Sequence, residues 1–392
     1  MDLLAKRTQR LLGSVIDSST SLVQRQRHDV IRFAVGSPAA EAIPTAIFDE
    51  LAPKAFTADA FDYAATDGDR QLRAALLELL SRTSEATTGE RLTITTGGMQ
   101  GLDLFGKLFI EHGDLVVIES PTYTNCTATA LSYGAELLEV STDGDGMIID
   151  ELEAAVERAG RAPKAIYVIP TFQNPAGTTM SLERRLRLIG LARRWNSMII
   201  DDDPYGMLRF QGQEIPNIRA LADADPLVYA VRTFSKIIAP GLRVGWVDTD
   251  PEIHQWLINA RQSMDTCTNL PNQRLVAAFL SAGYLDDHLQ LQRERYRERK
   301  IAMQSALAEH FGSRASWTDP DGGFYLWVTL PGVDTQALFP VALTEGVAYI
   351  PGPAFSPSGR FPDALRLCFA SMPPDRIREG IARLRRAVDQ LP

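Results

Sequence analysis

From about residue 70 to residue 250 the chain alternates between helical periods and short runs of apolar residues. The apolar runs occupy 114–121, 135–142, 164–171, 196–204 and 227–234, and the helical periods occupy 70–83, 99–112, 150–160 and 181–195. Short strands that are buried on both faces and alternate with helices are typical of a mostly parallel sheet covered on either side. The alternation therefore predicts an α/β fold for this part of the chain.

The pattern changes near residue 285, where this alternation ends. A long polar helix at 286–311, a strand of a separate antiparallel sheet at 322–330 and an amphipathic helix at 376–391 follow. Because 392 residues exceed the size of one ordinary domain, two domains are expected. We predict a large domain over 46–285 and a smaller α+β domain formed by 1–45 together with 286–392.

The N-terminal stretch 1–19 has apolar residues at helical spacing and is predicted to form an amphipathic helix. These residues are Leu3, Leu4, Leu11, Leu12 and Val15. The stretch lacks the long apolar core and the small-residue cleavage site of a signal peptide. We therefore expect neither a signal peptide nor a membrane span, and a cytoplasmic location.

Charge and cysteine content narrow the possible partners. The formal net charge of −9 opposes the attraction that nucleic acids and acidic membranes exert on basic proteins. Cys126, Cys267 and Cys368 are far apart, and no cysteine or histidine spacing matches a metal site. We expect free thiols in a reducing compartment, no metal, and neither a nucleic-acid nor a membrane partner.

Polar and aromatic segments follow the predicted strands. The segments are PTYTN after 114–121, FQNPAG after 164–171, DDDPYG at the end of 196–204 and SKIIAPGLR after 227–234. In sheets of this kind ligands bind at the carboxyl ends of the strands, which share one edge. A single ligand at that edge could therefore contact all four segments.

Lys236 occupies an unusual position within RTFSKIIAPGLRVGW (232–246). Lysines are mostly exposed, yet this one follows an apolar strand directly. Partial burial and a nearby cation such as Arg243 lower the pKa of an amine, and a deprotonated amine condenses with an aldehyde. The alternative is an ordinary surface lysine in a loop.

Three further segments have a chemical and a structural interpretation. A carboxylate of DDDPYG can hold a protonated pyridine nitrogen, with a tyrosine nearby for a phenolic oxygen of the same ring; the alternative is an Asp-Pro turn. Asn174 precedes Pro175 in extended backbone, so its amide can face a ligand, or the pair is a plain turn. The glycines of TTGGMQG precede a helix whose free N–H groups suit a phosphate, although no Walker or GxGxxG spacing is present.

Together these segments resemble the fold type I pyridoxal-phosphate enzymes, specifically the class I/II aminotransferases. The resemblance includes the branch of 2-aminoadipate and kynurenine aminotransferases and the aminotransferase domain of MocR-type regulators. It extends from FAVGSPAAEAIP (33–44) to ALRLCFA (364–370), and TFSKIIAPGLRVGW (233–246) is its most specific part. It implies a large domain with a mostly parallel seven-stranded sheet, a smaller α+β domain, and pyridoxal 5′-phosphate as cofactor.

The resemblance implies roles for the residues at the strand ends. Lys236 would form a Schiff base with the cofactor aldehyde and later move the substrate proton. Asp202, three residues before Tyr205, would pair with the pyridinium nitrogen. The other expected cofactor contacts are Tyr205 and Asn174 on the ring's 3′-oxygen, Tyr123 on the ring face, and Gly98, Met99, Thr233, Ser235 and Arg243 around the phosphate. Gly98 and Met99 replace the Ser-Gln frequent in the family, which removes a hydroxyl contact and keeps the backbone donors.

Three more residues complete the expected site. Arg366 would bind the substrate α-carboxylate with its planar guanidinium, and Gly36 would lie over the substrate, where a glycine permits close approach. Asn174 would also contact the substrate. Tyr63 matches a tyrosine that reaches the phosphate of a neighbouring subunit, so a homodimer with shared active sites is expected; the alternative is a packed aromatic ahead of a helix.

The expected activity is transfer of an amino group between an L-amino acid and a 2-oxo acid by ping-pong kinetics, within amino-acid metabolism. Elimination, decarboxylation, racemisation and cyclisation on the same scaffold stay open, because no sequence feature excludes them. A MocR-like sensor is less favoured, since FAVGSP begins at residue 33 and leaves no room for a winged-helix domain. The segments expected around the substrate side chain, SVIDSSTSLV, SPAAEAIP and GPAFSPSG, do not identify the amino donor.

Overall fold

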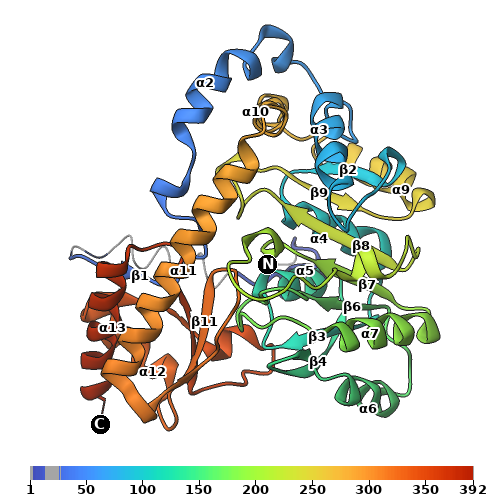
Figure 1. Cartoon of the computed structure of the whole chain (residues 1–392). Helices are drawn as coiled ribbons and strands as arrows, with labels where there is room; N and C mark the ends of the chain where they lie inside the picture. Colours follow the sequence, from blue (N-terminus) through green and yellow to red (C-terminus); the bar gives the residue numbers. More distant parts are fainter. Residues whose placement is uncertain (1–2, 14–25, 27, 392) are drawn as a thin grey trace.

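A central sheet runs through the computed structural model and carries helices on both faces (Figure 1). The structure describes residues 3–13, 26 and 28–391. Within them the strand order is β2-β9-β8-β7-β6-β3-β4-β5. The bounds are β2 Leu92–Thr95, β3 Leu115–Ser120, β4 Glu136–Asp143, β5 Gly146–Met147, β6 Ala165–Val168, β7 Met198–Asp202, β8 Val228–Thr233 and β9 Gly245–Asp248. Strands β8, β7, β6, β3 and β4 run parallel, and β9 is antiparallel to both of its neighbours.

The α/β prediction is confirmed, with one addition to the sheet. Seven strands of four to eight residues are present in the described part of the chain. The eighth, β5, has only two residues and pairs antiparallel with the end of β4, Thr142 with Met147. Gly146 has a φ of 86°, which lets the chain reverse there. A two-residue hairpin strand leaves no periodic signal, so the alternation pattern does not reveal it.

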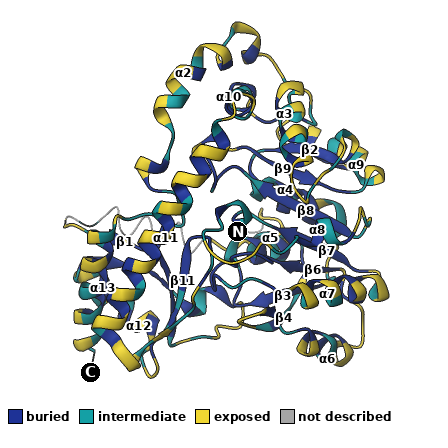
Figure 2. Cartoon of the chain, in the orientation of Figure 1, coloured by how far each residue is buried: buried dark blue, intermediate teal, exposed yellow. Residues whose placement is uncertain are grey.

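The two faces of the sheet are covered by different helices. Val116 and Ile118 of β3 belong to the apolar core under α4 (Gly98–Phe109), α5 (Thr124–Ser132) and α9 (Pro251–Gln262). Val117, which lies between them, packs in the core under α6 (Ile149–Ala159), α7 (Leu182–Trp195) and α8 (Ile218–Leu221). Because successive side chains of a strand point to opposite faces, β3 is buried along its whole length (Figure 2).

Both ends of α7 are capped. The Ser181 hydroxyl accepts a hydrogen bond from the Arg184 N–H and is the N-cap of α7. Asn196 ends the same helix in the left-handed region, with a φ of 52°. The strand β7 starts two residues later, so the sharp turn delivers the chain directly back to the sheet.

A smaller group of strands lies beside the central sheet and is formed mainly by the C-terminal part of the chain (Figure 1). Strands β10 (Ser316–Trp317), β11 (Tyr325–Thr329), β14 (Ala364–Cys368) and β13 (Ile350–Pro351) form an antiparallel sheet, which confirms the strand predicted at 322–330. Strand β1 (Ile31–Arg32) pairs in parallel with β12 (Val347–Ala348), so an N-terminal segment joins this group. Helices α11 (Tyr284–Phe311), α12 (Thr335–Thr344) and α13 (Pro374–Asp389) accompany it.

The remaining helices are α2 (Thr45–Ala55), α3 (Arg70–Ser81) and α10 (Leu270–Ser281), which pack on one another. The short 3-10 helices are η1 Lys6–Arg10, η2 Ala40–Ala42, η3 Ala58–Phe61, η4 Gly89–Arg91, η5 Gly206–Leu208, η6 Pro240–Leu242, η7 Gly312–Arg314 and η8 Gly352–Phe355. The domain boundary predicted after residue 285 falls inside α11. The domain limits 46–285, 1–45 and 286–392 stay a prediction.

The amphipathic helix predicted at the N-terminus is wrong for the residues that the structure describes there. Residues 3–13 contain only the 3-10 helix η1, and Leu3, Leu4, Leu11 and Leu12 are exposed, whereas Val15 lies outside the described residues. A short helix needs tertiary packing of its apolar face to persist, and more than half of the surface of each of these leucines is exposed in the described chain. None of the described helices is both long and apolar enough to cross a membrane.

Candidate functional site

A cavity of about 410 Å³ opens at the edge where the parallel strands of the central sheet end. All the predicted site residues line it except Tyr63 and Arg366. The lining residues that the sequence predicted are Gly36, Gly98, Met99, Tyr123, Asn174, Asp202, Tyr205, Thr233, Ser235, Lys236 and Arg243. Segments that are far apart in the chain therefore meet here because their strands end at one edge.

Lys236 follows β8 and lines this cavity. Its Nζ donates a hydrogen bond to the Gly36 carbonyl over 2.6 Å. Burial, together with the positive charges of Arg366 and Arg243, lowers the pKa of Lys236 to about 8, although Cys368 and Asp202 act in the opposite direction. The amine therefore loses its proton far more readily than an exposed lysine does, and the cavity setting differs from that of a surface loop.

Asp202 is the last residue of β7 and is buried. Its Oδ2 accepts a hydrogen bond from the Tyr167 hydroxyl over 2.8 Å. Burial raises the pKa of Asp202 to about 7, although Tyr167 and the charge of Arg232 act in the opposite direction. The two neighbouring carboxylates face elsewhere: Asp201 accepts from Arg232 Nη2 over 2.9 Å, and Asp203 accepts from the backbone N–H of Gly206 over 2.6 Å. Asp202 is thus the member of the triplet that lines the cavity.

One end of the cavity collects hydrogen-bond donors suited to an anion. Helix α4 begins at Gly98 with its first N–H groups free of helical partners. The Arg243 guanidinium lies close by, because a Cβ on Gly97 would stand only 2.7 Å from its Nη2. The Thr233 hydroxyl donates to Ser235 Oγ over 2.9 Å, which brings both hydroxyls to the same end. Backbone dipoles, two hydroxyls and a guanidinium therefore converge here.

Tyr123 lies on the wall of the cavity, directly after β3. Its hydroxyl donates a hydrogen bond to Met99 Sδ over 3.5 Å. Burial raises the pKa of the Tyr123 phenol well above its ordinary value, so the ring stays neutral. A neutral aromatic ring at this wall suits the face of a flat ligand. Met99 therefore contacts Tyr123 through its side chain, in addition to placing its backbone N–H at the start of α4.

Arg366 lies just behind the cavity on β14 and is fully buried. Its Nη1 donates to Asn174 Oδ1 over 2.9 Å, and its Nη2 donates to the Ala34 carbonyl over 2.7 Å. The guanidinium covers the ring of Tyr325, with 4.3 Å from Cζ to the ring centre. Among the described residues its Nε has no hydrogen-bond partner. This arginine is thus held rigidly beside Asn174 with donor capacity left over.

Tyr63 lies away from this cavity in the single chain. Its side chain is 82% exposed and borders a separate surface hollow with Arg70 and Arg274. The alternative reading of Tyr63 as a packed aromatic is wrong, because a packed ring would be buried. Within one chain it contributes nothing to the site around Lys236.

Sequence reasoning missed two tyrosines of the site. Tyr167 stands in the middle of β6 and holds Asp202, and Tyr325 stands on β11, where the Tyr205 hydroxyl donates to its own over 3.2 Å. Both occur inside apolar runs and read as core residues. A signal was available, because a buried tyrosine hydroxyl nearly always requires a hydrogen-bond partner.

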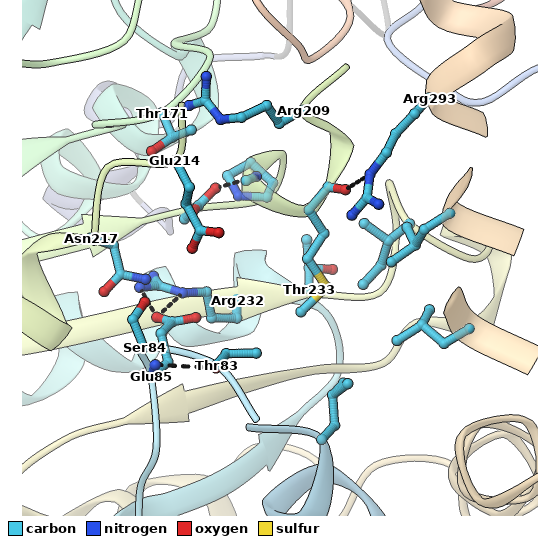
Figure 3. A pocket seen from close by; sticks show the side chains of 18 of the residues that line it. Thr83, Ser84, Glu85, Thr171, Arg209, Glu214, Asn217, Arg232, Thr233 and Arg293 are labelled. Carbon is cyan, nitrogen blue, oxygen red and sulfur yellow. Dashed lines mark hydrogen bonds and ion pairs between the residues drawn. The ribbon is translucent and has the colours of Figure 1, made fainter. Parts of the chain in front are cut away.

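A second cavity, of about 230 Å³, lies near β8 and shares Thr233 with the first (Figure 3). Arg232 is its central charge, and its Nε donates to Glu85 while its Nη2 binds Asp201. Arg293 donates to the backbone carbonyl of Met207. Arg232 is thus already paired within the protein, and no lysine lines this cavity. The reactive amine belongs to the first cavity alone among the described cavities.

Comparison with known proteins agrees with this geometry. The family described as aminotransferase class I and II matches residues 28–384. The aromatic-amino-acid aminotransferase 1 of Thermococcus litoralis is 39% identical over 370 residues, covering 92% of this chain and 88% of the relative.

Two solved structures resemble the whole fold. The kynurenine aminotransferase of Pyrococcus horikoshii, solved with PMP, has a TM-score of 0.93 at 35% identity, covering 99% of this chain and 97% of the other. The α-aminoadipate aminotransferase of Thermus thermophilus, complexed with N-(5′-phosphopyridoxyl)-L-leucine, has a TM-score of 0.91 at 33% identity and covers the same shares. The chain therefore belongs to the class I and II aminotransferase family, and it is a pyridoxal-phosphate-dependent aminotransferase.

Proposed function

We propose that Lys236 is the reacting amine of this aminotransferase and that Asp202 and the donors around Arg243 hold its cofactor. The observation that carries the proposal is that an amine with a pKa of about 8 lines the same cavity as a buried carboxylate. When bound, pyridoxal phosphate supplies an aldehyde for the amine and a ring that withdraws electrons from the substrate Cα.

The Asp202 carboxylate fits a protonated ring nitrogen. A buried carboxylate that lacks a cation is costly, which is why its pKa is raised to about 7. Tyr167 already donates to Oδ2, which leaves Oδ1 for a further donor. A positive ring nitrogen there would favour the ionised carboxylate, and the carboxylate would in turn keep that nitrogen protonated.

The anion-binding end fits a phosphate group. The N–H groups at the start of α4, the hydroxyls of Thr233 and Ser235 and the Arg243 guanidinium supply donors of the kind that phosphates bind. Tyr205 and Asn174 would donate to the ring oxygen, and Tyr123 would cover the ring face. Glycine suits position 97, because its φ of 78° lies in the left-handed region and a side chain there would press on the Arg243 guanidinium.

Lys236 then acts as the proton carrier. Its neutral Nζ would take the proton from the substrate Cα and return it to the cofactor carbon of the same C–N unit. Water would then release the 2-oxo acid and leave the amino group on the cofactor. A pKa of about 8 suits both steps, because the amine can hold and release a proton near neutral pH. A second 2-oxo acid reverses the steps, so ping-pong kinetics follow.

Arg366 would bind the α-carboxylate of the substrate, with Asn174 beside it. The hydrogen bonds to Asn174 and Ala34 fix the plane of the guanidinium, so little rotamer freedom is lost when a carboxylate binds. Gly36 lies at the same side of the cavity, and its carbonyl holds the Lys236 amine. Substrate binding by Arg366 and proton transfer by Lys236 would therefore take place on either side of Gly36.

The substrate class proposed is an amino acid with an uncharged aromatic or apolar side chain. Among the described residues the cations that line the cavity are Lys236 and Arg243, and both have other roles, as does Arg366 behind it. No described cation is left for a side-chain carboxylate, whereas the rings of Tyr123 and Tyr325 line the walls. Relatives named for aromatic amino acids and kynurenine support this choice.

We also propose a homodimer in which Tyr63 reaches the cavity of the second copy. Its side chain is exposed and lies away from the cavity of its own chain, as such a role requires. Tyr63→Phe should then weaken cofactor retention without changing the unfolding temperature of the protein. The cytoplasmic location expected from the sequence also stays a proposal.

A donor panel tests the proposed function. The holoenzyme is mixed with phenylalanine, tyrosine, kynurenine, leucine, 2-aminoadipate or aspartate, each with pyruvate or 2-oxoglutarate, and kcat/KM is measured for each pair. Aromatic and apolar donors should exceed acidic donors by roughly tenfold or more, the discrimination expected when a buried carboxylate lacks a partner. Preference for acidic donors would refute the substrate class, and release of ammonia or CO₂ in place of a 2-oxo acid would refute transamination.

A further inference from the structure

Tyr325 connects the two halves of the site. It stands on β11 opposite Cys368 of β14, and both side chains therefore point to the same face as Arg366, two residues earlier on β14. The Tyr325 ring lies under the Arg366 guanidinium, 4.3 Å from Cζ to the ring centre, and the residue is buried. A phenylalanine would satisfy this packing equally well. The hydroxyl therefore calls for a separate explanation.

The hydroxyl of Tyr325 has its own prepared position. The Tyr205 hydroxyl lies 3.2 Å away and is hydrogen-bonded to it. On another side stands Gly36, where an added Cβ would lie 2.0 Å from Tyr325 Oη, so only glycine leaves room for this oxygen. The carbonyl of the same glycine accepts from Lys236 Nζ. One hydroxyl thus contacts the residue beside the reacting amine and the tyrosine expected at the cofactor.

The two tyrosine hydroxyls carry one proton each, and this determines which hydrogen bonds the pair can donate. Each hydroxyl can accept as well as donate. If Tyr205 turns its proton toward the ring oxygen of the cofactor, its own oxygen is left as an acceptor in a buried setting. Tyr325 is the described residue that hydrogen-bonds to Tyr205 Oη, and it can supply that proton. A chain of two hydroxyls polarises along its length, which strengthens the outer bond.

We propose that Tyr325 is a positioning residue for the cofactor. In the structure Tyr205 donates to Tyr325; with cofactor bound this hydrogen bond reverses, so that the Tyr325 hydroxyl donates to Tyr205 and directs the Tyr205 proton to the ring oxygen. The proposal rests on the proposed function, because it takes Tyr205 as a cofactor ligand. Tyr325 itself need not touch the cofactor. It acts through Tyr205, while its ring independently supports Arg366.

The test is Tyr325→Phe, which removes the hydroxyl and keeps the ring under Arg366. The absorbance of the lysine-bound cofactor is titrated with pH in the reconstituted holoenzyme. Donation to the ring oxygen disfavours the protonated form of the linked nitrogen, so weaker donation should raise the titration midpoint. We expect a rise of about half a unit to one unit. Cofactor dissociation should become about two- to tenfold weaker, and the KM for the amino donor should stay unchanged.

Two comparison variants separate this role from a loss of packing. In a Tyr205→Phe background, Tyr325→Phe should produce no further shift of the midpoint, because the relay has already been broken. Tyr349→Phe is the matched control, since Tyr349 is fully buried in the same part of the molecule and its hydroxyl donates to the Thr335 carbonyl over 2.7 Å. It should leave the midpoint where it is.

The results distinguish failure of this proposal from failure of the proposed function. A normal pH-dependent band in the wild type, with an unchanged midpoint in Tyr325→Phe, overturns the relay and leaves the role of Lys236 intact. An equal shift in the Tyr205→Phe background also overturns it. A wild-type holoenzyme that lacks the absorbance of a lysine-bound cofactor altogether would overturn the relay and the proposed role of Lys236 together.

Discussion

The site is built from two regions that differ in how the chain places their residues. The sheet rim, which comprises Asp202, Tyr205 and Lys236, is formed by residues at or just after the ends of β7 and β8. The β11–β14 face, which comprises Tyr325 and Arg366, reaches its partners across the whole chain. The Arg366 contacts to Asn174 and Ala34 span 192 and 332 residues. The rim residues therefore take their positions from the ends of two neighbouring strands, although the Lys236 amine also reaches Gly36, 200 residues away. The face depends on how two sheets are held together.

The joint between these regions is a loop that carries Phe355 and the serines after it. Glu139 on β4 accepts a hydrogen bond from Ser356 Oγ over 2.6 Å and from the Ser358 N–H over 3.0 Å. The Phe355 ring lies under the Arg366 guanidinium, and the distance from Arg366 Cζ to the ring centre is 5.1 Å. The central sheet thus holds the loop, and the loop supports the arginine. Changes at the rim should abolish chemistry, whereas changes at the joint should weaken substrate binding.

Lys236→Ala should have the largest effect, because it removes the reacting amine from the rim. Turnover should fall by about four orders of magnitude, the upper range for loss of a proton-transfer group. The absorbance of the lysine-bound cofactor should vanish, while circular dichroism and the unfolding temperature should stay close to wild type. Retained turnover with L-amino acids would contradict the assignment.

Asp202→Asn should have the next largest effect, again at the rim. The amide cannot carry the charge that balances a protonated ring nitrogen, and a charge-assisted hydrogen bond contributes about 1.5–3 kcal/mol. We expect kcat to fall roughly 100-fold with cofactor still bound, measured by stopped-flow absorbance. Asp203→Asn is the control, since Asp203 caps the backbone of Gly206 and should change kcat far less. Equal losses in both variants would refute the distinction between these carboxylates.

The contrast between rim and face also explains what sequence reasoning could find. Lys236 and Asp202 are recognisable because the strand end, the proline turns and the polar residues all lie within one short segment. Local patterns also predicted the helix at 181–195 and the antiparallel strand at 322–330. The N-terminal helix was predicted from spacing alone, and it is wrong because spacing does not supply the surface that an apolar stripe must pack against.

The contacts of the β11–β14 face could not be predicted from local sequence patterns. Arg366 was identified by resemblance, yet its bond to Asn174 exists only because β14 meets the end of β6 in space. Tyr325 lies in an apolar run, and its partner Tyr205 is 120 residues away. No local pattern links such a pair, so the relay appears only when the folded chain brings the two hydroxyls together.

Arg366→Lys tests the face directly. An ammonium cannot keep the bonds to Asn174 and Ala34 while it also binds a planar carboxylate. The KM of the amino donor should rise roughly 10- to 100-fold with a smaller change in kcat, and the cofactor absorbance should be unchanged. Arg385→Lys on α13, where the arginine pairs with Asp389 and lies over the Phe311 ring, is the matched control. A selective loss of kcat would place this arginine in the chemistry instead.

Glu139→Gln should have the smallest effect, because it loosens the joint without touching the site. The amide keeps one acceptor but loses the charge that strengthens the bonds from Ser356 and Ser358, so the KM of the amino donor should rise about two- to fivefold at constant kcat. Burial alone would raise the pKa of Glu139, but the serine donors outweigh it and hold the pKa below the ordinary value of 4.5.

The direction of that pKa shift gives the joint a pH dependence. A carboxylate whose pKa is lowered on folding contributes its full stabilisation above its unfolded pKa, and it loses that stabilisation as the pH falls through the lowered value. The wild-type KM should therefore stay constant down to the ordinary glutamate range and rise only below it, whereas Glu139→Gln should show no such rise. Glu136→Gln, on the same strand but paired with the exposed Arg161, should behave like wild type. If Glu136→Gln raised the KM as much as Glu139→Gln does, the effect would come from any negative charge on β4. The joint would then have no separate role in substrate binding.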